Sequence, residues 1–135
     1  MCFERRQFMD IPIVRHDDAF ATTGQLCLHD LDRVVAAGFR SILCNRPDGE
    51  GGAEQPGSEA LSVRAEQLGL AFAYLPIPSV DVGEDEVRAF ARVLELLPKP
   101  VLAFCRTGRR SSRLHERYLA DFTSYAAPRA QESAC

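Results

Sequence analysis

Apolar and polar residues along the chain follow two alternating patterns. Short continuous apolar runs, typical of strands that are buried on both faces of a sheet, occupy residues 11–14, 20–23, 39–44, 70–77 and 101–104. Between and after them, apolar residues spaced three and four apart predict helices over residues 28–37, 58–68 and 84–97 and from about residue 111 onward. Alternating strands and helices predict an α/β fold with a mostly parallel sheet flanked by helices on both faces.

Glycine, proline and serine mark the ends of these elements. Gly38 and Gly69 follow the first two helical segments as C-terminal caps, and Ser58 is placed to begin the second. Pro98 ends the third helix because proline cannot continue it. Residues 45–57 hold four glycines and two prolines, which predicts a long polar loop.

The chain length and the periodicity indicate a single domain. A chain of 135 residues has room for one hydrophobic core, and the regular pattern runs from residue 11 to residue 121. We expect residues 1–10 to form an N-terminal extension. Residues 122–135 show little periodicity, and we expect them to form a flexible tail.

Composition and charge narrow the class of protein. The chain is 46% apolar and 26% charged, as in an ordinary soluble domain, and its net charge of −3 argues against a nucleic-acid binder. No apolar stretch approaches the roughly 20 residues of a membrane span, and the N-terminus lacks the apolar core of a signal peptide. We therefore expect a cytoplasmic protein without a membrane partner. Cysteines and histidines do not show the spacing of a zinc site, so no metal or cofactor is expected.

The positive charge is concentrated near the last predicted strand. Five of the fifteen arginines fall between Arg106 and Arg117, just after the strand at residues 101–104. Ligands of open α/β sheets bind beyond the carboxyl ends of the strands, and a loop that turns into a helix directs backbone N–H groups at an anion. Gly108 permits the backbone angles of such a loop, and Arg110 can hold an oxyanion with two hydrogen bonds.

Cys105 stands at the head of this loop. A helix N-terminus and the nearby arginines both favour the thiolate form of a cysteine, and a thiolate beside an anion site is an activated nucleophile. The sequence therefore predicts Cys105 and Arg110 as catalytic residues. The remaining residues of the predicted anion-binding loop are Arg106, Thr107, Gly108, Arg109 and Ser111.

The segment Cys-Arg-Thr-Gly-Arg-Arg-Ser at residues 105–111 is similar to the active-site loop of rhodanese-type sulfurtransferases and to the signature of cysteine-dependent phosphatases. Over residues 11–121 the chain resembles the phosphatase-like domain family of beta-lactamase-hydrolase-like proteins. The matching motifs are Ala-Gly-Phe-Arg at residues 37–40, Asn-Arg-Pro-Asp-Gly-Glu at 45–50, Ile-Pro at 77–78 and Pro-Val-Leu-Ala-Phe-Cys-Arg-Thr-Gly at 100–108. The resemblance implies a dual-specificity-phosphatase-like α/β fold.

The length of the loop from Cys105 to Arg110 favours a sulfurtransferase over a phosphatase. Four residues separate Cys105 from Arg110, and Phe104 precedes the cysteine; the phosphatases resemble one another in having five residues there and a histidine before the cysteine. The likeness to rhodanese-type loops implies a sulfurtransferase that forms a Cys105 persulfide from a small sulfur donor and passes the sulfur to a thiol acceptor. The resemblance also implies a persulfide-oxidising partner protein, because some family members are fused to such a domain.

Two alternatives remain open. The first is a protein-tyrosine or dual-specificity-type phosphatase that hydrolyses a phosphorylated substrate through phosphocysteine. Such an enzyme needs a general acid, for which Asp81, after the strand at residues 70–77, is the best candidate. The second is a non-enzymatic thiol redox sensor, for which a thiol of low pKa is typical.

Two more residues could lie at the rim of the same site. Arg46 and Asp48 follow the strand at residues 39–44, and the carboxyl ends of parallel strands meet at one edge of the sheet. The alternative for both is a structural role in a Pro-Asp-Gly turn.

Overall fold

The computed structural model describes residues 11–123. The expected N-terminal extension and most of the expected tail lie outside the described residues. The strands are β1 (Val14–Arg15), β2 (Phe20–Thr23), β3 (Ser41–Cys44), β4 (Ala71–Tyr74) and β5 (Val101–Phe104). The α-helices are α2 (Leu31–Ala36), α3 (Ser58–Gln67), α4 (Glu84–Leu96) and α5 (Arg109–Tyr118). Short 3₁₀ turns η1 (Leu28–Asp30) and η2 (Gly52–Glu54) and a π-helical turn η3 (Leu119–Thr123) complete the set.

The strands form one sheet in the order β1-β2-β5-β3-β4. Strands β2, β5, β3 and β4 are parallel, and only β1 pairs antiparallel, as a hairpin with β2. All residues of β2, β3 and β5 are buried. This burial explains why their sequences are continuous apolar runs. Strand β5 therefore lies at the centre of the sheet and carries the segment after it to the middle of the carboxyl edge.

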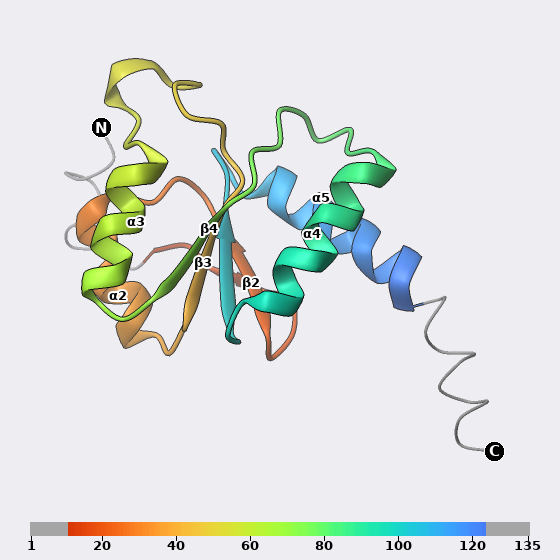
Figure 1. Cartoon of the computed structure of the whole chain (residues 1–135), viewed down its shortest axis with the longest axis horizontal. Helices are drawn as coiled ribbons and strands as arrows, with labels where there is room; N and C mark the ends of the chain where they lie inside the picture. Colours follow the sequence, from red (N-terminus) through yellow and green to blue (C-terminus); the bar gives the residue numbers. More distant parts are fainter. Residues whose placement is uncertain (1–10, 124–135) are drawn as a thin grey trace.

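Two helical layers cover the sheet, with α2 and α3 on one face and α4 and α5 on the other (Figure 1). Alternate residues of each strand face opposite layers. Ile42, Leu102 and Phe104 pack on the α2–α3 side, and Leu43 and Ala103 pack on the α4–α5 side. The predicted single α/β domain with a mostly parallel sheet is confirmed.

The ends of three elements differ from the prediction. The run at residues 11–14 contributes only Val14 to a strand, because Pro12 has no N–H for a sheet hydrogen bond. The strand predicted at residues 70–77 is regular only over β4, a partly exposed edge strand, although the N–H groups of Leu75 and Ile77 still donate to the carbonyl oxygens of Cys44 and Asn45. Helix α5 begins at residue 109, not 111. No helix within residues 11–123 has both the length and the apolar character to span a membrane.

We predict that Phe90→Ala in α4 lowers the free energy of unfolding by about 3–5 kcal/mol, since it leaves a cavity in the core. Phe90 is fully buried and contacts Phe20 and Tyr118 edge-on. Urea denaturation followed by circular dichroism measures the change.

Leu96 in the same helix is 83% exposed, so Leu96→Ala is the matched control and should change stability by less than about 0.5 kcal/mol. Equal losses for the two variants would contradict the assignment of this core.

Candidate active site

Cys105 directly follows the central strand β5 and is completely buried. The chain turns at Gly108, whose φ of +95° lies in the left-handed region, and α5 then begins. A side chain at this position would be strained, and its Cβ would lie 3.3 Å from the carbonyl oxygen of Thr23. Glycine therefore permits both the turn and its close approach to β2.

The residues just after β2 pack against the backbone of the Cys105 loop. The N–H of Gln25 donates to the carbonyl oxygen of Arg106 at 3.2 Å. A Cβ at Gly24 would lie 3.0 Å from the same oxygen. The loop conformation is thus fixed by backbone packing against a neighbouring strand end as well as by its own residues.

Backbone N–H groups surround the sulfur of Cys105. The N–H of Gly108 donates to Sγ at 3.1 Å. Burial alone raises the pKa of the thiol, but hydrogen bonds from the N–H groups of Ser111, Thr107, Arg110 and Gly108 outweigh it, and the pKa of Cys105 is lowered. The site therefore favours a thiolate, as the sequence predicts.

Arg110 is the arginine of the loop that points inward. Its Nη1 donates to Oε2 of Glu50 at 2.6 Å and to the carbonyl oxygen of Ile77 at 2.9 Å, and its Nη2 donates to Oε1 of Glu50 at 2.8 Å. Donating these hydrogen bonds to the Glu50 carboxylate raises the pKa of Arg110, and the sulfur of Cys105 contributes to the same direction. The Nε–H and the second Nη2–H have no oxygen acceptor among residues 11–123 and remain available to an oxyanion beside the sulfur.

Arg46 is connected to Arg110 through Glu50. Its Nε donates to Oε1 of Glu50 at 2.8 Å, and its Nη1 donates to the side-chain oxygen of Gln25 at 3.0 Å. It therefore fixes Glu50, which in turn fixes Arg110. Hydrogen bonds to Arg110 lower the pKa of Glu50 from 4.5 to about 2, with a second contribution from Arg46.

Asp48 has a different position from Glu50 although the two are neighbours in sequence. Its carboxylate accepts from the backbone N–H of Ser58 at 2.8 Å and from the Ser58 hydroxyl at 2.7 Å. Both oxygens are used at the start of α3. The structure thus gives Asp48 the role of a helix cap and does not bring it to Arg110.

Asn45 and Ser111 are buried beneath the loop. The Ser111 hydroxyl donates to Oδ1 of Asn45 at 2.8 Å, and Nδ2 of Asn45 donates to the carbonyl oxygen of Leu75 at 2.9 Å. The backbone of Asn45 also accepts from Ile77 N–H and donates to the Phe104 carbonyl. Asn45 therefore joins the ends of β3, β4 and β5 to the first turn of α5. Sequence reasoning missed Asn45 and Glu50, and their only signal was membership of the motif at residues 45–50.

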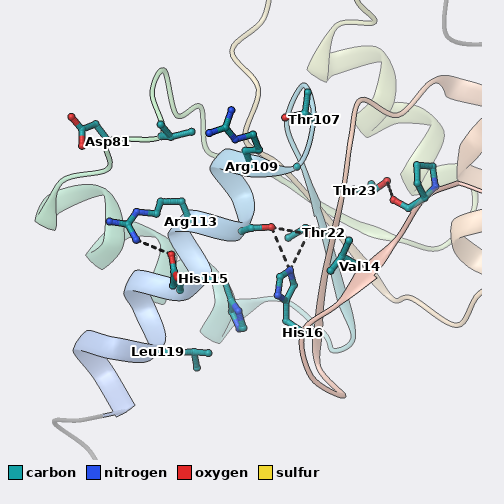
Figure 2. A pocket seen from close by; sticks show the side chains of 15 residues that line it. Val14, His16, Thr22, Thr23, Asp81, Thr107, Arg109, Arg113, His115 and Leu119 are labelled. Carbon is teal, nitrogen blue, oxygen red and sulfur yellow. Dashed lines mark hydrogen bonds and ion pairs between the residues drawn. The ribbon is translucent and has the colours of Figure 1, made fainter.

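The side chains of the other predicted loop residues do not contribute to the sulfur site. The side chains of Arg106, Thr107 and Arg109 are exposed. Asp81 is exposed and lines one cavity together with Thr107, Gly108 and Arg109. In Figure 2 its carboxylate points away from Arg109.

The fold and the site define a phosphatase-like α/β domain in which a buried cysteine begins the loop between the central strand and α5. The chain belongs to the family described as the phosphatase-like domain of beta-lactamase hydrolase-like proteins, whose model matches residues 11–120. It is 32% identical over 103 residues to the beta-lactamase hydrolase-like protein of Xylella fastidiosa and 31% identical over 102 residues to that of Agrobacterium fabrum. The chain spans about a quarter of these relatives, 24% and 23% of their lengths.

Two solved structures that are similar to this chain are described as candidate phosphatases. A candidate phosphatase from Neisseria meningitidis is 31% identical, with a TM-score of 0.73 and coverage of 91% of this chain and 89% of that one. A candidate phosphatase from Shewanella putrefaciens is 18% identical, with a TM-score of 0.66 over 79% of this chain and 66% of that one, and shows likeness of fold alone. The predicted family and the phosphatase-like fold are confirmed.

We predict that Cys105 of the folded protein ionises at a pH below the ordinary thiol pKa of about 8.5. The reason is that backbone N–H groups stabilise its ionised sulfur. Ultraviolet absorbance of the thiolate during a pH titration measures it. Cys105→Ser should remove this transition. Cys44→Ser should leave it in place, because burial raises the pKa of Cys44 to about 12. A transition that survives in Cys105→Ser would refute the assignment.

We predict that Glu50→Gln weakens the fold above pH 4.5 and flattens its acid dependence. The lowered pKa means that the ionised carboxylate stabilises the folded state above pH 4.5 and that this contribution is lost as the pH falls toward about 2. Urea unfolding at a series of pH values measures the difference from the natural protein.

Glu54→Gln, an exposed carboxylate in the same loop, is the control and should leave the pH dependence unchanged. If the two variants give the same profile, the ion pair between Glu50 and Arg110 does not hold the loop.

Proposed function

We propose that this protein is a cysteine-dependent phosphatase that hydrolyses phosphate monoesters through a phosphocysteine on Cys105. The observation that carries the proposal is the buried thiol of Cys105 at the head of the loop, with the N–H of Gly108 3.1 Å from its sulfur and further backbone N–H groups lowering its pKa. The same N–H groups and the free edge of Arg110 can hold the oxygens of a phosphoryl group, where negative charge is concentrated in the transition state.

The first step transfers the phosphoryl group to sulfur. The thiolate of Cys105 attacks phosphorus, so a P–S bond forms as the ester P–O bond breaks. The leaving oxygen takes a proton from an acid, for which Asp81 is the candidate because it lines the cavity that reaches the loop. Closure of the Asp81 segment over the substrate would bring the carboxyl group to the leaving oxygen.

The second step restores the enzyme. Water attacks phosphorus, the P–S bond breaks, and inorganic phosphate leaves with the thiolate regenerated. The Asp81 carboxylate accepts the proton that water loses. Proton and charge therefore balance over the cycle without a cofactor. Glu50 and Arg46 act as positioning residues, since Glu50 accepts from Arg110 and Arg46 donates to Glu50.

The comparisons with known proteins favour phosphate hydrolysis, whereas the length of the Cys105 loop favours sulfur transfer. The Neisseria relative, which matches most of both chains at 31% identity, is described as a candidate phosphatase, and this supports the phosphatase as the first choice. The primary prediction from the sequence, a rhodanese-like sulfurtransferase, has no such support among these relatives.

One observation keeps sulfur transfer as the second candidate, namely the four-residue spacing between Cys105 and Arg110. In that reaction Cys105 attacks the outer sulfur of thiosulfate, sulfite leaves, and a second thiolate removes the sulfur from the Cys105 persulfide. The acceptor would be a small thiol or a persulfide-oxidising partner protein.

We predict that the protein releases phosphate from an aryl phosphate such as phenyl phosphate and that Cys105→Ser abolishes this activity, because a hydroxyl does not ionise at neutral pH. Asp81→Asn should lower kcat by about a hundredfold or more, the usual contribution of a general acid. Asp85→Asn is the matched control, since Asp85 is an exposed carboxylate four residues away that pairs with Arg88. Steady-state rates of phosphate release are measured for the natural protein and the three variants.

The intact mass of the protein after incubation with thiosulfate separates the two candidates. A phosphatase should show no stable gain in mass. One added sulfur that requires Cys105 and that cyanide removes, together with no phosphate release, would replace the phosphatase proposal with sulfur transfer.

A further inference from the structure

A cavity of about 720 Å³ opens beside the Cys105 loop. It lies between α5 and the β1–β2 hairpin and reaches the loop at Thr107, Gly108 and Arg109 (Figure 2). Its volume is that of a site for a small organic molecule and far exceeds the space that a phosphoryl group needs. Since the candidate acid Asp81 also lines it, the cavity is placed to hold the part of the substrate that leaves with the ester oxygen.

Three polar side chains form its centre, and each comes from a different segment. The hydroxyl of Thr22 on β2 lies 2.9 Å from Nε2 of His16 and 3.0 Å from Oγ of Ser112. Oγ of Ser112 and Nε2 of His16 are 3.4 Å apart. Ser112 follows one turn after the loop, because its N–H donates to the carbonyl oxygen of Gly108. We call these three residues the polar triad.

The triad presents two hydroxyl groups and an imidazole, which carry hydrogen-bond donors and acceptors. Thr22 is 1% exposed, so its hydroxyl is held by His16 and Ser112, whereas His16 is exposed and Ser112 partly exposed to the cavity. Such an arrangement is suited to hydroxyl groups of a ligand.

Equal numbers of basic and acidic side chains line the cavity. Arg109 and Arg113 are matched in number by Asp81 and Glu116, and Nη1 of Arg113 pairs with Oε1 of Glu116 at 2.7 Å. Burial lowers the pKa of His115, which favours its neutral form. The cavity therefore offers no excess positive charge to a second anionic group.

Apolar side chains form the margin. Val14, Val80 and Leu119 all line the cavity and are 58%, 43% and 42% exposed. They come from β1, the segment before α4 and the first position of η3. A ligand with a nonpolar ring face or edge would remove some of this surface from water.

We propose that this cavity is the leaving-group subsite and that it selects phosphate monoesters of neutral, hydroxyl-bearing small molecules, such as sugars or nucleosides. The proposal rests on the proposed phosphatase function. The phosphoryl group occupies the Cys105 loop, and a hydroxyl of the organic part bonds to Ser112 and His16. Ser112 is then a residue that determines specificity, one turn beyond the loop.

Steady-state kinetics with glucose phosphate, adenosine monophosphate and phenyl phosphate test the selection. Loss of one hydrogen bond to the substrate corresponds to about tenfold in affinity. We expect Ser112→Ala to lower kcat/KM about tenfold more for a hydroxylated ester than for phenyl phosphate, mainly through KM. Ser112→Thr, which keeps the hydroxyl, should restore the preference. Ser62→Ala in α3, on the opposite side of the sheet, is the control.

Equal losses on all three esters would overturn the subsite and assign Ser112 a structural role. A phosphotyrosine peptide that is cleaved better than both hydroxylated esters, with a preference that Ser112→Ala does not alter, would also overturn it.

Binding of the alcohols alone tests the cavity without catalysis. Glucose and adenosine are added to the protein, and histidine ring signals are followed by NMR. We expect the His16 signal to shift with one of them and the shift to be lost in Ser112→Ala, while His29, remote on η1, stays unchanged. No shift with either alcohol overturns the subsite. A His16 shift without phosphate release on any ester refutes the phosphatase proposal instead.

Discussion

The site depends on the convergence of backbone N–H groups on the buried sulfur of Cys105. A thiol in a core environment resists ionisation because the thiolate loses its water. Here the first turn of α5 and the loop before it replace that water with fixed dipoles. The central position of β5 makes this possible, because only a strand with neighbours on both sides can deliver a cysteine to the middle of the edge and a helix directly above it.

A second constraint concerns the guanidinium of Arg110, which is 10% exposed and needs a partner. Glu50 provides one without filling the site, because its two oxygens take one edge of the planar group and leave the other edge for substrate. Arg46 keeps Glu50 in that orientation. The charge of the site is therefore arranged before any ligand arrives, which reduces the reorganisation that binding an anion requires.

Sequence patterns predicted the elements formed by consecutive residues and missed the contacts between residues far apart in the sequence. The strand, the cysteine, the glycine turn and the helix at residues 101–118 are consecutive, so their arrangement follows from periodicity and glycine geometry. The different roles of Asp48 and Glu50 do not follow from sequence, because each is decided by contacts with Ser58 or Arg110. Arg106, Arg109 and Arg110 are equally basic in sequence. The place of Arg110 in the loop predicted its role, and in the structure Arg110 is the one of the three whose side chain is buried.

The long-range origin of the site has a consequence for folding. Glu50 and Arg110 are 60 residues apart, and Asn45 and Ser111 are 66 apart. Their contacts require β3 and β4 to be in register with β5. Loop closure over such separations must precede these hydrogen bonds. A partly folded chain therefore has an ordinary cysteine, and the reactive thiolate exists only once the whole sheet has assembled. The lowered pKa is in this sense a property of the completed fold, and before the fold is complete Cys105 reacts as an ordinary thiol.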